Sequence, residues 1–286
     1  MKTRLIENAE TRQSVLNKIK ANAGSLAVLI PTAFLMVMPF LWMLTTSLKS
    51  RGQTGIPPYL YPTTFNFSNY LAAWNAAPFL RYYLNTLIVA VAVVCSRIVF
   101  SAMAAFAFSV LDFKGRNILF LAFLGTMMIP LHSTLIPSYM IILNLGWLNT
   151  YRAMIVPRMV DAFSIFLLRQ RFISIPQDYI DAAKIDGCSN WKLLWRIIMP
   201  MSRSSVVAMA LFTFLFIWND FLWPLLVANN EKLRTIQVGL QAFSGQYLTE
   251  WTYMMAGTVT ATIIPIIIFF FAQKQFVEGL TRSGLK

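Results

Sequence analysis

Long apolar segments with few charges alternate with short polar segments along the chain. Six of the apolar segments have the length expected of membrane-spanning helices, at residues 24–47, 82–110, 117–141, 151–168, 204–227 and 252–272. A helix needs about 20 predominantly apolar residues to cross the hydrocarbon core of a bilayer. The pattern therefore predicts an all-α membrane protein with six transmembrane helices. The fourth segment gives the weakest signal, because it contains Pro157, Arg158 and Asp161.

The composition also indicates a membrane protein. Hydrophobic residues make up 57% of the 286 residues and charged residues only 12%, whereas soluble domains average about 45–50% apolar and about 25% charged residues. Disordered, collagen-like and disulfide-rich classes are excluded on the same grounds. Aromatic residues at the segment boundaries, Tyr82, Tyr83 and Trp223 among them, are typical of the aromatic belts at membrane surfaces.

The basic residues are distributed unevenly between the two sides that six spans define. Sixteen lie in the N-terminal arm 1–23, in the loops 111–116 and 169–203, and at the C-terminal end, whereas five lie in the two opposite loops. Lys and Arg accumulate in cytoplasmic loops, so both termini are predicted to be cytoplasmic. The net charge of +13 then needs no nucleic acid as a partner. The predicted organisation is an arm, a six-span transmembrane domain over 24–274, and a cytoplasmic tail over 275–286.

The inventory of reactive residues argues against catalysis by this chain. The sequence has two cysteines, Cys95 and Cys188, and a single histidine, His132, which is too few for a structural zinc site or a disulfide framework. It has no G-x-x-x-x-G-K-[ST] segment, so it has no P-loop for ATP. We therefore predict a protein that is not an enzyme, with no catalytic residues, no metal site and no cofactor of its own.

The loop between the fourth and fifth segments, residues 169–203, is too polar to span and too patterned for a linker. Pro176 and Asp178 are typical of a helix start, since an acidic side chain in the first turn matches the helix dipole. Gly187 is suited to the left-handed position that ends a helix. A second amphipathic stretch, 189–198, follows and leads to Pro200. The loop therefore predicts a helix, a glycine turn and a second helix.

This loop resembles the EAA loop of ABC importer permeases, which reads E-A-A, three residues, G, nine residues, I-x-L-P. The matching residues are Asp181-Ala182-Ala183, Gly187 and Ile197-Ile198-Met199-Pro200, with Asp181 in place of Glu and Met199 in place of Leu. Other segments over about 24–286 also match permeases of the carbohydrate type, and among them the chain is most similar to the MalG-type subunit. They are Asn85-Thr86, Leu148-Asn149-Thr150, Trp218-Asn219-Asp220-Phe221 with Pro224-Leu225, Thr235-Ile236, and the ending 275–286.

The resemblance implies a subunit of a bacterial inner-membrane importer that moves a carbohydrate by alternating access. Its implied partners are a second, MalF-type permease subunit, an ABC ATPase dimer that holds ATP and Mg²⁺, an extracytoplasmic solute-binding protein, the sugar and membrane lipid. The residues implied to contact the ATPase are Asp181, Ala182, Ala183, Asp186 and Gly187, with Gly279, Leu280 and Lys286 of the tail. The outer loop 228–250 is implied to probe the binding protein with a tip of Ser244, Gly245, Gln246 and Tyr247.

Charged residues within the predicted spans form a second group of candidates. Arg97 lies near the middle of the second segment, and a charge at that depth is a functional hypothesis by default. Arg97 either lines the translocation path, where it suits an anionic sugar, or forms an ion pair with Asp220 or with a partner subunit. Asn219 and Asp220 are further candidates for the path wall. Arg158 and Asp161 are three residues apart and are predicted to pair with each other.

Two other functional classes compete with this interpretation. An ion-coupled secondary transporter needs no ATPase, but such proteins usually carry internal repeats with broken helices at corresponding positions, and no repeat is evident here. An intramembrane enzyme needs polar groups that converge at membrane depth, and Arg97, Asp161 and Asp220 are too few and match no motif. Neither class accounts for the EAA pattern.

Overall fold

The computed structural model describes residues 23–55, 59–244 and 249–281, and within these ranges it contains helices and no strand. The first half comprises α2 Ala23–Ser47, η1 Arg51–Thr54, α3 Ser68–Ala76, α4 Phe79–Ser109, α5 Arg116–Gly125, η2 Thr126–Met128, η3 Leu131–Thr134, α6 Leu135–Asn144, α7 Tyr151–Ile155 and η4 Val156–Arg158. The second half comprises α8 Ala162–Ile173, α9 Gln177–Ile185, α10 Asn190–Lys192, η5 Leu193–Ile198, α11 Met199–Met201, α12 Arg203–Trp218, α13 Leu222–Val227, η6 Glu231–Leu233, α14 Ile236–Leu240, η7 Gln241–Phe243 and α15 Trp251–Thr281.

Three continuous helices of the described chain are long and apolar enough to cross a membrane, at Gly24–Ser47, Phe79–Ser109 and Trp251–Lys274. Two further helix pairs qualify only when each is counted as one bent span. The first joins Arg116–Met128 to Leu131–Asn144 with a bend of 93°, and the second joins Asn190–Met201 to Arg203–Trp218 with a bend of 83°. The all-α prediction is thus confirmed, whereas the count of six spans stays a prediction.

The structure divides several segments that the apolar pattern predicted as single spans. The third segment breaks at Pro130, because proline provides no backbone N–H and forces the preceding residue, Ile129, into an extended conformation with ψ of 118°. The fourth segment is not one helix, since the chain leaves η4 near Met159 and re-enters a helix as α8. The fifth ends at Trp218 and resumes as α13.

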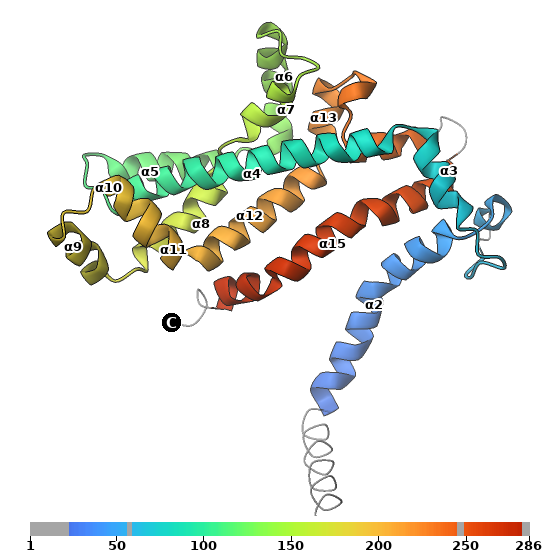
Figure 1. Cartoon of the computed structure of the whole chain (residues 1–286), viewed down its shortest axis with the longest axis horizontal. Helices are drawn as coiled ribbons and strands as arrows, with labels where there is room; N and C mark the ends of the chain where they lie inside the picture. Colours follow the sequence, from blue (N-terminus) through green and yellow to red (C-terminus); the bar gives the residue numbers. More distant parts are fainter. Residues whose placement is uncertain (1–22, 56–58, 245–248, 282–286) are drawn as a thin grey trace, which may run out of the picture.

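The long helices α4, α12 and α15 run lengthwise through the molecule, with α12 packed against both of the others and α8 packed against α4 (Figure 1). The loop helix α9 lies at one end of this bundle. The short helix α3 lies at the opposite end, where α2 ends and α4 and α15 begin (Figure 1). Helix α2 contacts α15 near that end and then diverges from the bundle, so most of its side chains are exposed. The predicted boundary of the sixth segment, 252–272, falls inside the longer helix α15.

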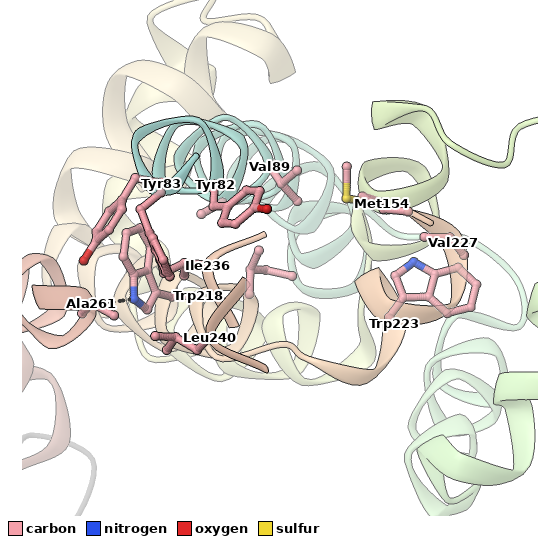
Figure 2. Packing of buried hydrophobic residues seen from close by; sticks show 14 of the residues in the cluster. Tyr82, Tyr83, Val89, Met154, Trp218, Trp223, Val227, Ile236, Leu240 and Ala261 are labelled. Carbon is pink, nitrogen blue, oxygen red and sulfur yellow. Dashed lines mark hydrogen bonds between the residues drawn. The ribbon is translucent and has the colours of Figure 1, made fainter. Parts of the chain in front are cut away.

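The main core lies where α4 meets α12, α14 and α15, and aromatic side chains fill it. Tyr83 and Trp218 meet edge to face with 6.1 Å between ring centroids, and the Trp218 indole N–H donates to the carbonyl of Ala261 at 3.1 Å (Figure 2). Trp223 donates in the same way to the carbonyl of Ala153 at 2.9 Å. The aromatic-belt prediction is therefore wrong for Tyr82, Tyr83 and Trp223, because all three are buried in the protein core.

Candidate functional site

Helix α9 forms within the 169–203 loop, as the sequence predicted. It follows Pro176, carries Asp178 in its first turn and Lys184 in its last, and both charges are favourable with the helix dipole. Gly187 has φ of +72°, the left-handed conformation that glycine adopts without steric cost. Its N–H donates to the carbonyl of Lys184 at 3.0 Å, and the N–H of Cys188 donates to the carbonyl of Ala183 at 2.9 Å. These two bonds form a Schellman motif, so Gly187 terminates α9.

One face of α9 is fixed to the rest of the protein. Ile180 and Ala183 are three residues apart and both are buried, in a cluster with Leu193, Leu194 and Ile198. Phe106 of α4 and Leu168 and Phe172 of α8 belong to the same cluster. The resemblance implied that both alanines of the EAA-like motif contact the ATPase, and that contact stays a prediction. In the structure Ala182 is exposed, whereas the Ala183 side chain is buried and anchors α9.

The opposite face of α9 is open to solvent. Asp181, Ala182, Asp186 and Gly187 are exposed, and Asp181 accepts a hydrogen bond from the side chain of Gln177 at 3.0 Å. Sequence reasoning missed Ile185, whose side chain is 86% exposed on this otherwise polar helix. Tyr179 at 56% and Trp191 at 61% are also largely exposed. An exposed large apolar side chain among polar neighbours is the kind of residue that a protein interaction surface uses. The missed signal was an isoleucine beside the charged residues of a surface helix.

The loop is connected rigidly to α12. After the glycine turn, the Ser189 side chain caps α10 by accepting from the N–H of Lys192, and the chain continues as the π-helical stretch η5 and the short α11. The Arg171 guanidinium at the end of α8 donates to the carbonyl of Met201 at 2.7 Å, beside the 83° bend. Buried contacts and hydrogen bonds therefore join α9 to α8, α4 and α12.

The charged residues that the sequence placed within the predicted spans form one cluster of two arginines and two aspartates. Arg97 Nη1 lies 3.2 Å from Asp161 Oδ1, and Arg97 Nε donates to the carbonyl of Arg158 at 2.8 Å. Arg158 Nη2 lies 3.1 Å from Asp220 Oδ2. Phe216 lies near both guanidinium groups, at 5.9 Å from Arg97 and 5.4 Å from Arg158. The cluster joins α4, the η4–α8 junction and the break between α12 and α13.

The pairing differs from both predictions made for it. Arg97 was expected either to line the translocation path or to pair with Asp220 or with a partner subunit, and Arg158 was expected to pair with Asp161. The observed pairs are Arg97–Asp161 and Arg158–Asp220. The physical reason is the interruption of the helix between η4 and α8. Asp161 lies at the N-cap of α8, where its Oδ2 accepts from the N–H of Ser164 at 3.3 Å, so it no longer lies one helical turn from Arg158.

The cluster carries two positive and two negative charges, and its arginines are compensated within the chain. Arg97 is only 7% exposed. Arg158 and Trp223 line a pocket of about 110 Å³, together with Thr134 and Ser138. Asp220 and Trp223 border a smaller void of about 10 Å³, the space of a single water molecule. Asn219 lies at the exposed C-terminus of α12 and accepts from Gln237 at 3.4 Å.

The 228–250 loop is anchored on the start of α4 by the residues that carried the family resemblance. The Asn85 amide donates to the carbonyls of Lys232 and Arg234, at 3.0 and 2.9 Å, and accepts from the Tyr151 hydroxyl at 2.7 Å. The Thr86 hydroxyl accepts from the N–H of Ile236 at 2.8 Å. Sequence reasoning marked Asn85-Thr86 and Thr235-Ile236 without giving them a role. The structure shows that they hold this loop in place.

The same loop borders a polar pocket of about 270 Å³. Asn229, Arg234, Gln241 and Ser244 are among its lining residues. Ser244 also pairs with Thr249 in an isolated β-bridge. The other predicted tip residues, Gly245, Gln246 and Tyr247, lie outside the described residues, as do Lys286 and residues 1–22 of the predicted arm. The backbone of Gly279 and Leu280 belongs to α15.

Comparisons with known proteins agree with this architecture. Residues 97–282 match the family described as the binding-protein-dependent transport system inner membrane component. The arabinooligosaccharides transport system permease protein AraQ of Halalkalibacterium halodurans is 34% identical over 259 residues, with 89% of this chain and 92% of AraQ covered. The sn-glycerol-3-phosphate transport system permease protein UgpE of Shigella flexneri is 32% identical over 245 residues, with coverage of 83% and 87%.

A solved structure shares the fold. It is described as a bacterial ABC transporter involved in the import of the acidic polysaccharide alginate, and its matching chain superposes with a TM-score of 0.78 at 22% identity, over 91% of this chain and 97% of that one. The extent of the sequence matches confirms the resemblance that rested on the EAA-like loop. The chain therefore belongs to the family of inner membrane components of binding-protein-dependent transport systems.

Proposed function

We propose that this chain is one of two permease subunits of a bacterial ATP-driven importer for an oligosaccharide or sugar derivative. The observation that carries the proposal is helix α9, which is anchored on one face by Ile180 and Ala183 and exposes Asp181, Ile185 and Asp186 on the other. A cytoplasmic ATPase dimer is the proposed partner of the exposed face. ATP and Mg²⁺ bind to that partner, since the chain has no P-loop of its own.

The proposed mechanism is alternating access driven through α9. Closure of the ATPase dimer displaces α9, and the buried cluster of α9, η5, α8 and α4 passes this displacement to the bundle. The charge cluster of Arg97, Arg158, Asp161 and Asp220 holds α4, α8 and the α12–α13 break together as they move. Packed cores have discrete arrangements, so a displacement at one end shifts whole helices. Both termini are proposed to be cytoplasmic, on the charge distribution.

The relatives and the charge cluster both bear on whether the sugar is neutral or anionic. AraQ is described as a permease for arabinooligosaccharides and UgpE as one for glycerol-3-phosphate, so relatives take both neutral and anionic substrates. Arg97 and Arg158 are each paired with an aspartate, so this cluster has no excess positive charge for an anion. We therefore favour a role for Arg97 in stabilising the path wall, with Asn219 and Asp220 beside it. A second permease subunit supplies the other half of the path.

An extracytoplasmic solute-binding protein is the proposed partner at the end opposite α9. The polar pocket of the 228–250 loop provides hydrogen-bonding groups from Asn229, Gln241 and Ser244 and a cation from Arg234. Its rigid attachment through Asn85 and Thr86 suits a surface that must meet a partner in one orientation. The tail after 274 is proposed to lie against the ATPase.

The test is reconstitution of the purified complex in proteoliposomes, with sugar uptake and ATP hydrolysis measured together. Ile185→Glu is the informative variant, because this side chain is 86% exposed and its replacement removes no internal packing. We expect assembly of the two permease subunits to persist while ATPase binding and uptake are lost. Ile173→Glu, a matched change at an exposed isoleucine outside α9, is expected to retain ATPase binding and uptake. Uptake without ATP, driven by an ion gradient, would refute the proposal.

A further inference from the structure

The segment between α2 and α4 contains a long stretch without charge. Residues 59–80 include no Asp, Glu, Lys or Arg, although they contain seven Phe, Tyr or Trp residues. The stretch does not span the membrane, since its first part is irregular and its helix α3 has only nine residues. Figure 1 places α3 at the end of the bundle opposite α9. The transport mechanism described above gives this stretch no role.

Hydrogen bonds fix this segment at the C-terminal end of α2. The side-chain amide of Asn69 donates to the carbonyls of Ser47 and Lys49, both at 2.8 Å, and the N–H of Asn66 donates to the carbonyl of Leu48 at 2.9 Å. The last carbonyls of a helix lack partners within it, and here the segment supplies donors to carbonyls at this end. Its depth along the membrane normal is therefore the depth at which the apolar helix α2 ends.

The side chains that the segment presents outward are large and apolar. Six of them are each more than half exposed, namely Tyr59, Leu60, Tyr61, Phe65, Phe67 and Leu71. The buried face of α3 is formed by Asn69 and Ala73, which leaves Leu71 on the opposite face. A surface of this composition would be poorly soluble in water. Tyrosine rings in particular are enriched where hydrocarbon meets headgroups, because the ring is apolar and the hydroxyl is polar.

We propose that residues 59–71 lie in the headgroup–hydrocarbon boundary of the membrane at the end of the bundle opposite α9, where they set the depth of α2. Lipid is the occupant that the surroundings favour, because the segment is hydrogen-bonded to the end of α2, an apolar helix long enough to cross a membrane that exposes large apolar side chains as far as Leu44. Lys49, whose carbonyl accepts from Asn69, has its side chain turned away from solvent, with its ammonium 4.2 Å from the ring centre of Trp42. The stretch itself supplies no charged group for a soluble partner, since residues 59–80 contain no Asp, Glu, Lys or Arg.

The test is a depth measurement on the assembled importer in lipid nanodiscs. Cys95 and Cys188 are replaced by Ser, and a nitroxide is attached to a single cysteine at position 67 or 71, where the native side chains are 69% and 67% exposed. Power saturation then compares collisions with oxygen, which enters hydrocarbon, and with a water-soluble nickel chelate. A label at Phe34 of α2 is the hydrocarbon reference, and one at Lys114 in the α4–α5 loop is the aqueous reference.

The expected result at positions 67 and 71 is an oxygen collision rate above that at position 114 and a nickel collision rate several-fold below it. Values equal to those at position 114 would place the segment in water and overturn the proposal. Exclusion of both reagents would show that a protein subunit covers the segment, which also overturns it. The measurement requires no ATP or sugar, so its outcome is separate from that of the transport proposal.

Discussion

The charge cluster provides the sharpest test of the proposed mechanism. Replacing Asp161 by Asn removes the carboxylate that lies 3.2 Å from Arg97. The Asn oxygen can still accept from the N–H of Ser164, so the N-cap of α8 is retained. Arg97 keeps its hydrogen bond to the carbonyl of Arg158. The substitution therefore changes one quantity above all, which is the compensation of the Arg97 charge.

The loss of stability expected for Asp161→Asn depends on how deeply the ion pair is buried. Removing one partner of a buried ion pair costs about 3–5 kcal/mol, because the remaining charge is left uncompensated. The Arg97 side chain is 8% exposed but that of Asp161 is 26% exposed, so water reaches one side of the pair and the lower end applies. We expect a loss of about 3 kcal/mol for Asp161→Asn. For a chain of this size, that corresponds to a fall of about 6 °C in apparent melting temperature.

A double-mutant cycle isolates the pair. Asp161→Asn, Arg97→Met and the double variant are purified as complexes, and their melting is followed by size-exclusion chromatography after heating. The double variant removes both charges, so it is expected to be more stable than the sum of the single losses indicates. Sugar uptake is measured on the same samples. Additive losses in the cycle, or a single-variant loss below one degree, would refute the assignment of a buried, coupled pair.

Three further outcomes are expected. Gly187→Ala must hold a side chain at φ of +72°, which costs about 1–2 kcal/mol; amide exchange in α9 is expected to rise and uptake to fall, with a smaller effect for Gly187→Asn. Gly239→Ala would place a Cβ 2.2 Å from a ring carbon of the buried Tyr82. The free energy of unfolding is therefore expected to fall by about 1–3 kcal/mol, which a melting experiment measures. Asn69→Ala leaves the carbonyls of Ser47 and Lys49 without their side-chain donor, so the free energy of unfolding is expected to fall by about 1–3 kcal/mol in the same melting experiment.

Each of these variants has a control within the chain. Gly125→Ala is the control for Gly239, because a Cβ at Gly125 meets no atom within 4 Å and its φ is not left-handed. Equal effects at Gly125 and Gly239 would contradict the packing argument. Equal exchange rates for Gly187→Ala and the unaltered protein would show that the Schellman motif does not hold the end of α9. For Asn69→Ala, an unchanged melting temperature would mean that water donates hydrogen bonds to the carbonyls of Ser47 and Lys49 in place of the Asn69 amide.

Local features of the 169–203 loop were predictable from the sequence because they depend on neighbouring residues alone. A proline start, acidic residues in the first turn and a glycine at the left-handed position act within a few residues of each other. The observed bounds of α9, Gln177–Ile185, and the φ of Gly187 agree with that prediction. Which alanine faces inward was not predictable, because Ala182 and Ala183 differ only in what α8 and η5 place beside them.

The spans were predictable as apolar segments but not as helices of definite length. Hydropathy reports preference for hydrocarbon, and it does not distinguish a straight helix from two helices joined at a bend. The break at Pro130 carried a local signal in proline itself. The break between η4 and α8 had a weaker signal in the sequence. This break nevertheless changed the ion pairs, because it moved Asp161 away from Arg158.

The sequence by itself determined the class of this protein, its apolar segments and the family to which it belongs, because hydrophobicity and motif spacing are properties of the chain read in order. Only the tertiary structure decided which charges meet, which aromatic rings are buried, and which face of α9 is free. Those choices depend on residues far apart in sequence, such as Arg97 and Asp161 or Asn85 and Arg234. Such pairs meet only after the helices pack, so no local pattern specifies them.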